Sequence, residues 1–315
     1  MHFADRLAER ARILDTPVCV GIDPRYELLP RELRRRAREV ESDPARAAAW
    51  AYAELAAAVI DAVTEYACAV KPQAAFFEAL GPPGFAAFEK VLRMARERGL
   101  VAIADAKRGD IGSTSLAYAQ AFFGGREVED RVLAGIEADA VTVNPYFGTD
   151  GVDPFLRACD ERERGIFVLV RTSNPSAAEL QDLRVSSPDG DGDAPLYARV
   201  AGLVAAWGRT RLGKCGYSSV GAVVGATDRK MLAEARGLLP ESILLVPGYG
   251  AQGGGPDDVA CAFDANGEGA IVNASRSIVF ADPAATTPAG LASAAAAAAR
   301  RMRDEIREAV ARSGC

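Results

Sequence analysis

The stretch LVAIADAKRGDIGST (residues 100–114) starts as an apolar strand and ends in a run of charges. Its first half predicts a β-strand that is buried on both faces, as in a parallel sheet. Asp105, Lys107 and Asp110 follow directly. Charged side chains seldom lie at the end of a buried strand unless they are paired or take part in chemistry. The stretch therefore predicts a buried strand with a charged site at its carboxyl end.

Similar apolar runs recur along the whole chain, and helical patterns fill most gaps between them, as in residues 44–66, 83–99 and 226–239. In order, the runs are VCVGI (18–22), ACAVK (67–71), LVAIAD (100–105), DAVTVN (139–144), GIFVLV (165–170), VGAVVG (220–225), ILLVPG (243–248) and AIVNAS (270–275). Eight strands alternating with helices favour a closed (β/α)8 TIM barrel, because an open doubly wound sheet commonly has about five or six strands. A Rossmann domain ranks second, since no G-x-G-x-x-G follows the first strand.

We expect one (β/α)8 barrel domain over residues 1–315, with an extra N-terminal helix and an insertion between strands five and six. MHFADRLAERAR (1–12) has the pattern of a charged amphipathic helix, and SSPDGDGDAP (186–195) that of a surface loop. No apolar run is long enough to span a bilayer. The six cysteines show no C-x-x-C spacing, which favours reduced thiols and a cytoplasmic location.

Charge and histidine content exclude several classes of function. The net charge of −6 argues against nucleic acid as a partner. The only histidine is His2, at the N-terminus, so a Ser–His or Cys–His nucleophile and a His-rich metal site are excluded. An enzyme with this sequence must move protons with Lys, Asp, Glu, Tyr or Cys.

Charged side chains gather at the predicted carboxyl ends of strands, where barrels of this type carry their active sites. Asp105 and Lys107 share one face because side chains alternate along a strand. Lys71 ends the neighbouring second strand, which predicts a Lys–Asp–Lys run with Asp110 a short loop beyond. Alternating charges keep one another ionised. A purely structural ion-pair network is the alternative, but four such residues at one mouth favour function.

A second cluster predicts a phosphate site. PGYGAQGGG (247–255) and NASRS (273–277) follow strands seven and eight, whose loops often bind phosphate in such barrels. Arg276 would supply a cation for the phosphate; the alternative is that the glycines only form a turn and that Arg276 is a surface residue. Asp23 follows strand one and either binds a ligand or caps the turn before Pro24. Ser173 follows strand five, either at the same mouth or as a turn residue.

Together these motifs resemble the orotidine 5′-phosphate decarboxylase family, most closely its longer bacterial type 2 form. DAKRGDIGST looks like the family signature D-x-K-x-x-D-I-x-x-T, and GIDPR, AVKPQAAFFE, VTVNPYFGTDG, TSNPS, VPGYGAQGG and VNASRSI occur in the family's order. The resemblance implies a homodimer with shared active sites that needs no cofactor and no metal. It implies the conversion of orotidine 5′-monophosphate to UMP and CO2, the last step of de novo pyrimidine nucleotide synthesis.

The resemblance also implies a role for each motif residue. The implied catalytic residues are Lys71, Asp105 and Lys107 of one subunit and Asp110 of the other. The implied substrate-binding residues are Asp23 on the ribose, Ile111 and Thr114 from the partner, Ser173 on the pyrimidine edge, and Gln252, Ser275 and Arg276 at the phosphate. One departure is Arg108-Gly109, where the shorter forms of the family commonly carry an apolar residue and Ala.

Loss of CO2 from carbon 6 of the pyrimidine leaves an in-plane electron pair with no ready electron sink. We therefore expect Lys107 to stabilise this carbanion and to donate the proton that replaces CO2. A magnesium-dependent sugar-phosphate decarboxylase or aldolase of the same superfamily is one alternative, although a cation at Lys71 disfavours a divalent ion. A non-catalytic nucleotide-phosphate-binding barrel is another, although a pure binder has no need of buried ammonium groups beside carboxylates.

Overall fold

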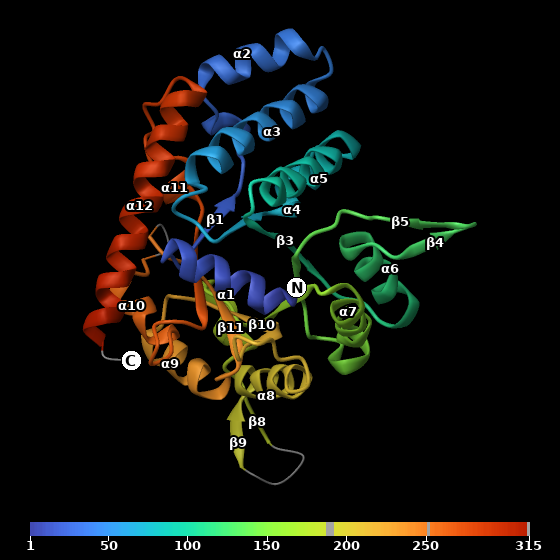
Figure 1. Cartoon of the computed structure of the whole chain (residues 1–315), viewed down its shortest axis with the longest axis vertical. Helices are drawn as coiled ribbons and strands as arrows, with labels where there is room; N and C mark the ends of the chain where they lie inside the picture. The colour runs from blue at the N-terminus through green and yellow to red at the C-terminus, as the bar shows by residue number, and fades with distance from the viewer. Residues whose placement is uncertain (187–191, 251–252, 314–315) are drawn as a thin grey trace.

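The computed structural model describes residues 1–186, 192–250 and 253–313. Within them, eight parallel strands close into a barrel in the order β1-β12-β11-β10-β7-β6-β3-β2 (Figure 1). The barrel strands are β1 (Val18–Ile22), β2 (Ala69–Pro72), β3 (Val101–Arg108), β6 (Ala140–Val143), β7 (Gly165–Arg171), β10 (Ser218–Val224), β11 (Ser242–Pro247) and β12 (Ala270–Ala274). Each falls on one of the predicted apolar runs, so the (β/α)8 prediction is confirmed.

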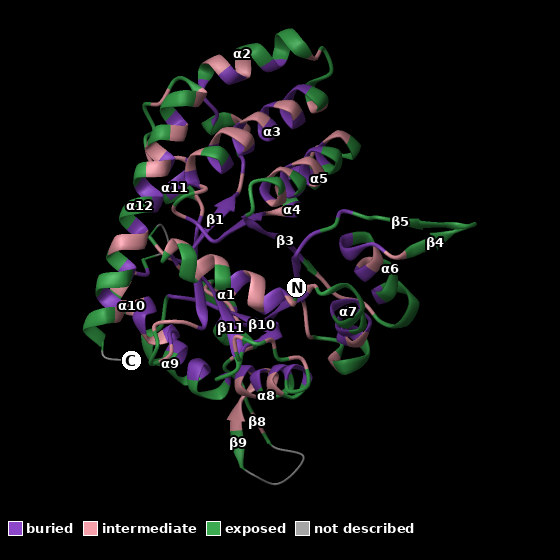
Figure 2. Cartoon of the chain, in the orientation of Figure 1, coloured by how far each residue is buried: buried purple, intermediate pink, exposed green. Residues whose placement is uncertain are grey.

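Helices follow the strands and surround the barrel, and buried positions recur along most of them (Figure 2), while α2 packs against α3. They are α2 (Arg31–Val40), α3 (Pro44–Val63), α4 (Ala74–Glu78), α5 (Pro82–Glu97), α6 (Gly112–Phe123), α7 (Gly148–Arg162), α8 (Leu196–Gly208), α9 (Arg229–Leu238), α10 (Pro256–Val259), α11 (Arg276–Val279) and α12 (Pro288–Ser313), with short 3-10 turns at η1 (Tyr26–Leu28), η2 (Pro175–Glu179) and η3 (Ala260–Ala262). The start of α3 shows how sequence sets a boundary: the Asp43 carboxylate accepts a hydrogen bond from Arg46 N at 2.9 Å, and Pro44 occupies the first turn. Among the described residues, no helix is both long and apolar enough to cross a bilayer.

The N-terminal helix α1 (Phe3–Leu14) closes the amino end of the barrel (Figure 1). Phe3 is fully buried and meets Phe167 of β7 edge-on, with ring centroids 5.9 Å apart. Gly165 at the start of β7 makes this possible, because a Cβ there would lie 2.2 Å from Phe3 Cδ1. The extra helix predicted from the sequence therefore covers one end of the barrel, and the carboxyl end remains for the site.

Two antiparallel hairpins extend from the barrel (Figure 1). The hairpin β8 (Arg184–Ser186) and β9 (Asp193–Pro195) lies where the insertion was predicted; residues 187–191 between them lie outside the described residues. The hairpin β4 (Arg126–Val128) and β5 (Arg131–Leu133) was not predicted, and all its strand residues are exposed. Without a buried face, its sequence REVEDRVL carried no alternating pattern that marks a strand.

The packing of Phe3 under the barrel predicts a large loss of stability on truncation. Phe3→Ala should lower the free energy of unfolding by about 3–5 kcal/mol, because it leaves a cavity against Phe167 and Gly165. Ile13 on the same helix is 72% exposed, so Ile13→Ala should change it by no more than about 0.5 kcal/mol. Urea unfolding of both variants tests this. A loss below about 1 kcal/mol for Phe3→Ala would show that α1 does not support the barrel.

Candidate active site

A cavity of about 490 Å³ opens at the carboxyl ends of the strands. The predicted site residues that line it are Asp23, Lys71, Asp105, Lys107, Ser173, Ser275 and Arg276. They come from β1, β2, β3, β7 and β12 or from the turns that follow these strands. Residues distant in sequence therefore meet because parallel strands in a barrel all end at the same rim.

Asp105 lies at the centre of the charged cluster and is only 5% exposed. Its Oδ2 is 2.5 Å from Lys71 Nζ, and its Oδ1 is 2.5 Å from Lys107 Nζ. One buried carboxylate thus holds two ammonium groups, one on each oxygen. The predicted Lys–Asp–Lys run is present.

Two residues that sequence reasoning missed complete the contacts of Asp105. Thr142 Oγ1 of β6 donates to Asp105 Oδ1 at 3.0 Å and accepts from Lys107 N at 2.9 Å. Gln73 Nε2, just after β2, donates to Asp105 Oδ2 at 3.1 Å. Alternation was the available signal, because Gln73 stands two positions after Lys71 and therefore on the same face. The carboxylate accepts four hydrogen bonds and is fixed on both oxygens.

The opposite charges set the ionisation of the buried pair. Burial alone would raise the pKa of Asp105, but the ammonium groups of Lys71 and Lys107 hold it well below its usual range. Burial alone would lower the pKa of Lys71, but the charges of Asp105 and Asp23 hold it above its ordinary value. Both groups are therefore ionised at neutral pH.

Lys107 is the member of the run that reaches the open cavity. Its side chain is 43% exposed, against 6% for Lys71 and 7% for Asp105. Its backbone is left-handed, with φ of 47°, and the pairing of β3 with β6 shifts register between Ala104 and Arg108. Such irregularities re-aim a side chain, and a non-glycine residue keeps this conformation only when its surroundings enforce it.

Next to β2 in the barrel, β1 and then β12 carry further polar groups of the cavity. Asp23 Oδ1 is buried and has no hydrogen-bond partner among the described residues, so it can accept a hydrogen bond from a hydroxyl. Ser275 precedes α11, and Arg276 is its first residue. Gly21 makes room for this corner, because a Cβ there would lie 2.0 Å from Ser275 Oγ. A side chain at position 21 would displace Ser275 from the rim.

Three predicted site residues do not line this cavity in their own chain: Asp110, Ile111 and Thr114. The Asp110 carboxylate instead accepts a hydrogen bond from Ile111 N at 2.8 Å, just before α6. Three of the four predicted charges therefore gather at one mouth, and Asp110 does not join them within the chain. Gln252 lies outside the described residues.

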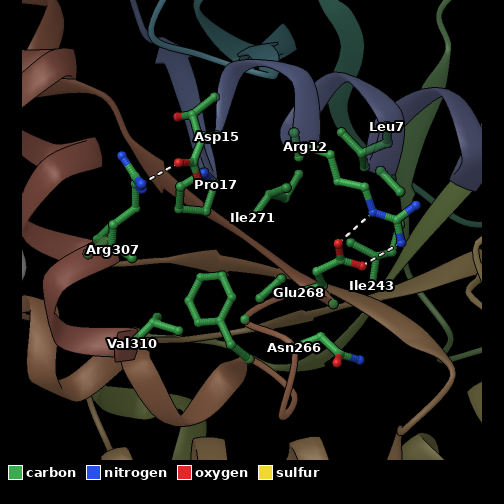
Figure 3. Close-up of a pocket in the computed structure, with 18 of the residues that line it drawn as sticks. Leu7, Arg12, Asp15, Pro17, Ile243, Asn266, Glu268, Ile271, Arg307 and Val310 are labelled. Carbon is green, nitrogen blue, oxygen red and sulfur yellow. Dashed lines mark hydrogen bonds and ion pairs between the residues drawn. The ribbon is translucent and has the colours of Figure 1, made fainter. Parts of the chain in front are cut away.

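A second cavity, of about 570 Å³, lies at the amino ends of the strands beside α1, α12 and the loop before β12 (Figure 3). Its charged side chains pair with one another: Arg12 Nε is 2.5 Å from Glu268 Oε1, and Arg307 pairs with Asp15. Apolar side chains such as Ile271 and Val310 line the rest. None of the predicted site residues lies here, and no shared buried carboxylate organises it.

Comparison with known proteins identifies the family. A model of the orotidine 5′-phosphate decarboxylase / HUMPS family matches residues 16–287. The chain belongs to this family. It is 50% identical over 281 residues to an orotidine 5′-phosphate decarboxylase of Rhodopirellula baltica, covering 89% of each chain. It is 40% identical over 306 residues to one of Deinococcus radiodurans, covering 96% of each chain.

Solved structures agree with this assignment to the orotidine 5′-phosphate decarboxylase family. The Leishmania donovani OMP decarboxylase superposes with a TM-score of 0.72 at 34% identity, covering 98% of this chain and 99% of that one. The resemblance inferred from DAKRGDIGST and its companion motifs is thus confirmed for family and fold. The individual roles of the site residues stay predictions.

The depressed pKa of Asp105 makes stability depend on pH. An unfolded aspartate has a pKa of about 3.9, so the contribution of ionised Asp105 is complete above about pH 4 and is lost as the pH falls toward the lower folded pKa. The difference in free energy of unfolding between wild type and Asp105→Asn should therefore be constant from about pH 5 to about pH 7 and shrink below about pH 4. Urea unfolding across this range measures it. A difference that persists unchanged below about pH 3 would contradict the depressed pKa.

Proposed function

We propose that the cavity around Asp105 performs the reaction that family membership gives this chain, the decarboxylation of orotidine 5′-monophosphate to UMP and CO2 in pyrimidine nucleotide biosynthesis. The observation that carries the proposal is the ion pair of Lys107 with buried Asp105, which directs one ammonium group at the open cavity. The cavity of about 490 Å³ is of the size that small-molecule sites commonly have.

The chemistry assigns Lys107 its role. When the bond between carbon 6 and the carboxylate breaks, CO2 leaves and the electron pair stays on carbon 6 in the plane of the ring. The Lys107 ammonium stabilises this charge as it develops and then transfers a proton to carbon 6. Lys71 balances Asp105 from the other side, so Asp105 holds Lys107 in place before the substrate arrives. No reorganisation is then needed during the reaction.

Other residues that line the cavity bind the ribose, the pyrimidine and the phosphate of the nucleotide. The unpartnered Oδ1 of Asp23 accepts from a ribose hydroxyl, and Ser173 meets the pyrimidine edge. Arg276 binds the phosphate together with the backbone at Ser275, where the cation and the start of α11 coincide. We assign Gln252 to the phosphate as well, because it stands in the VPGYGAQGG motif. Binding energy from the phosphate is thereby available to orient the distant reacting carbon.

Asp110 completes the site from a second copy of the chain, so the active protein is a homodimer. We place it in the cytoplasm because its six cysteines show no C-x-x-C spacing. A Cβ on Gly109 would lie 3.6 Å from Phe147 Cδ2, so the residue next to Asp110 lies beside that ring. Ile111 is 56% exposed and Tyr146 78% exposed. Tyr146 contacts the ring of Phe147 edge-on, and exposed apolar side chains near Asp110 favour a protein contact surface. The position of Asp110 outside its own cavity agrees with this arrangement.

The geometry of the charged cluster does not favour either alternative, a magnesium-dependent enzyme or a non-catalytic nucleotide binder. A magnesium-dependent relative needs an acidic ligand where Lys71 stands, and here that ammonium is itself paired with Asp105 at 2.5 Å. Among the described residues, no three His, Cys, Asp or Glu side chains gather as metal ligands do. A non-catalytic nucleotide binder gains nothing from the strained backbone of Lys107.

Replacing Lys107 tests the proposed function directly. Lys107→Ala should lower kcat by at least about 1,000-fold, because it removes the group that stabilises the carbanion. Binding of UMP should remain, since the proposed phosphate and ribose contacts come from other residues, Arg276 and Asp23. The side chain of Lys90 on α5 is 45% exposed and pairs with Glu54 away from the cavity, and Lys90→Ala serves as the matched control with unchanged turnover. Turnover is followed by the ultraviolet absorbance of orotidine 5′-monophosphate.

The same assay separates the alternatives. EDTA should leave the wild-type rate unchanged; a rate abolished by EDTA and restored by Mg²⁺ would favour the metal-dependent reaction. Comparable rates for wild type and Lys107→Ala would remove Lys107 from the mechanism.

Mixing two inactive variants tests the shared site. In a dimer of one Asp110→Ala chain and one Lys107→Ala chain, one site carries both lesions and the other carries neither. Random exchange of equal amounts should therefore restore about a quarter of the wild-type rate per site. Mass spectrometry verifies the exchange. Absence of recovery despite complete exchange would mean that each chain supplies its own Asp110.

A further inference from the structure

Arg108 follows Lys107 directly but takes no part in the cavity. Its guanidinium pairs with Glu78 and lies over the rings of Tyr118 and Phe122, 5.6 Å and 5.8 Å from their centroids. Both rings belong to α6, on the outer side of the barrel wall. Adjacent residues of β3 thus contact opposite sides of the wall, Lys107 inside and Arg108 outside. Arg108 stands in the position where the sequence departs from the shorter forms of the family.

Glu78, the partner of Arg108, lies on a short helix next to the charged cluster. Glu78 is the last residue of α4, and Gln73 is the residue that precedes this helix. Gln73 donates to Asp105 at 3.1 Å, and Lys71 lies two residues before it. The pair between Arg108 and Glu78 therefore joins the segment that carries Lys71 and Gln73 to the segment that carries Lys107.

Lys107 needs such a restraint because its left-handed backbone is unfavourable for a lysine. The Lys107 amide donates to Thr142 Oγ1. The carbonyl of the next residue, Arg108, accepts from Asn144 N at 2.8 Å. These bonds fix the backbone of β3 toward β6. The guanidinium of Arg108 fixes the backbone of β3 toward α4 and α6, on the outer side of the barrel wall.

We propose that Arg108 and Glu78 are positioning residues for the reaction: their ion pair holds Lys107 at its place between Asp105 and the substrate. The proposal rests on the role of Lys107 in the proposed function. A guanidinium suits the task because its planar group can pair with a carboxylate and lie over aromatic rings at the same time. The pair is partly exposed, with side chains 25% and 35% accessible, so its effect on global stability is small. Its effect on rate is large, because a displacement of about 1 Å at a reacting group can cost about 100-fold.

The test separates rate from binding and stability. Arg108→Met and Glu78→Gln should each lower kcat about 10- to 100-fold, with KM for orotidine 5′-monophosphate and the affinity for UMP within about threefold of wild type. The urea midpoint should stay close to that of wild type. Arg108→Lys should recover part of the rate, because it keeps a cation for Glu78. The double variant Arg108→Met with Glu78→Gln should be no slower than the slower single variant, because one interaction is lost in both.

A matched ion pair away from the mouth supplies the control. Arg98 and Asp61 lie 2.8 Å apart and join the end of α5 to α3, with side chains 39% and 56% exposed. Asp61→Asn should leave kcat unchanged. The proposal is overturned if both single variants retain wild-type kcat, or if UMP affinity and the urea midpoint fall in step with kcat. Should Arg108→Met not fold, Glu78→Gln decides. Failure of the proposed function would be seen separately, as absence of turnover by the wild type.

Discussion

The site depends on one carboxylate that is shared by two ammonium groups. Asp105 sits in the barrel wall and binds Lys71 and Lys107 at 2.5 Å each. A buried charge without a partner would be too costly to keep, and here each charge compensates the next. The consequence is a fixed electric field at the mouth of the barrel that exists before a ligand binds. Preorganised charge of this kind acts on a transition state without the cost of reorganising water.

The two ends of the barrel have different parts in this arrangement. At the amino end, buried Phe3 of α1 packs against Phe167 and supports the barrel away from the charged cluster. The carboxyl end collects the last side chains of neighbouring strands, which places a cation, an anion and a second cation in a row. The cost of the arrangement is local: Lys107 adopts a left-handed backbone. Thr142 inside the wall and Arg108 outside it hold that conformation.

The strands and the central charges were predictable because both follow from short patterns. Apolar runs of strand length repeat along the chain, and alternation puts Asp105 and Lys107 on one face. Gln73 and Thr142 were missed because an uncharged polar residue in an apolar stretch looks like a turn or core position until its partner is known. The backbone of Lys107 was beyond prediction, because tertiary contacts enforce it. The position of Asp110 outside its own cavity follows from the loop after β3, whose path no pattern specifies.

The most direct test of the fixed field is the position of Lys107 relative to the reacting carbon. A high-resolution crystal structure with UMP bound would measure the distance from Lys107 Nζ to carbon 6 of the pyrimidine. We expect about 3–3.5 Å, the range for groups poised to react, with the bond between Lys107 and Asp105 intact. A pyrimidine bound elsewhere, or carbon 6 beyond the reach of Lys107, would contradict this expectation.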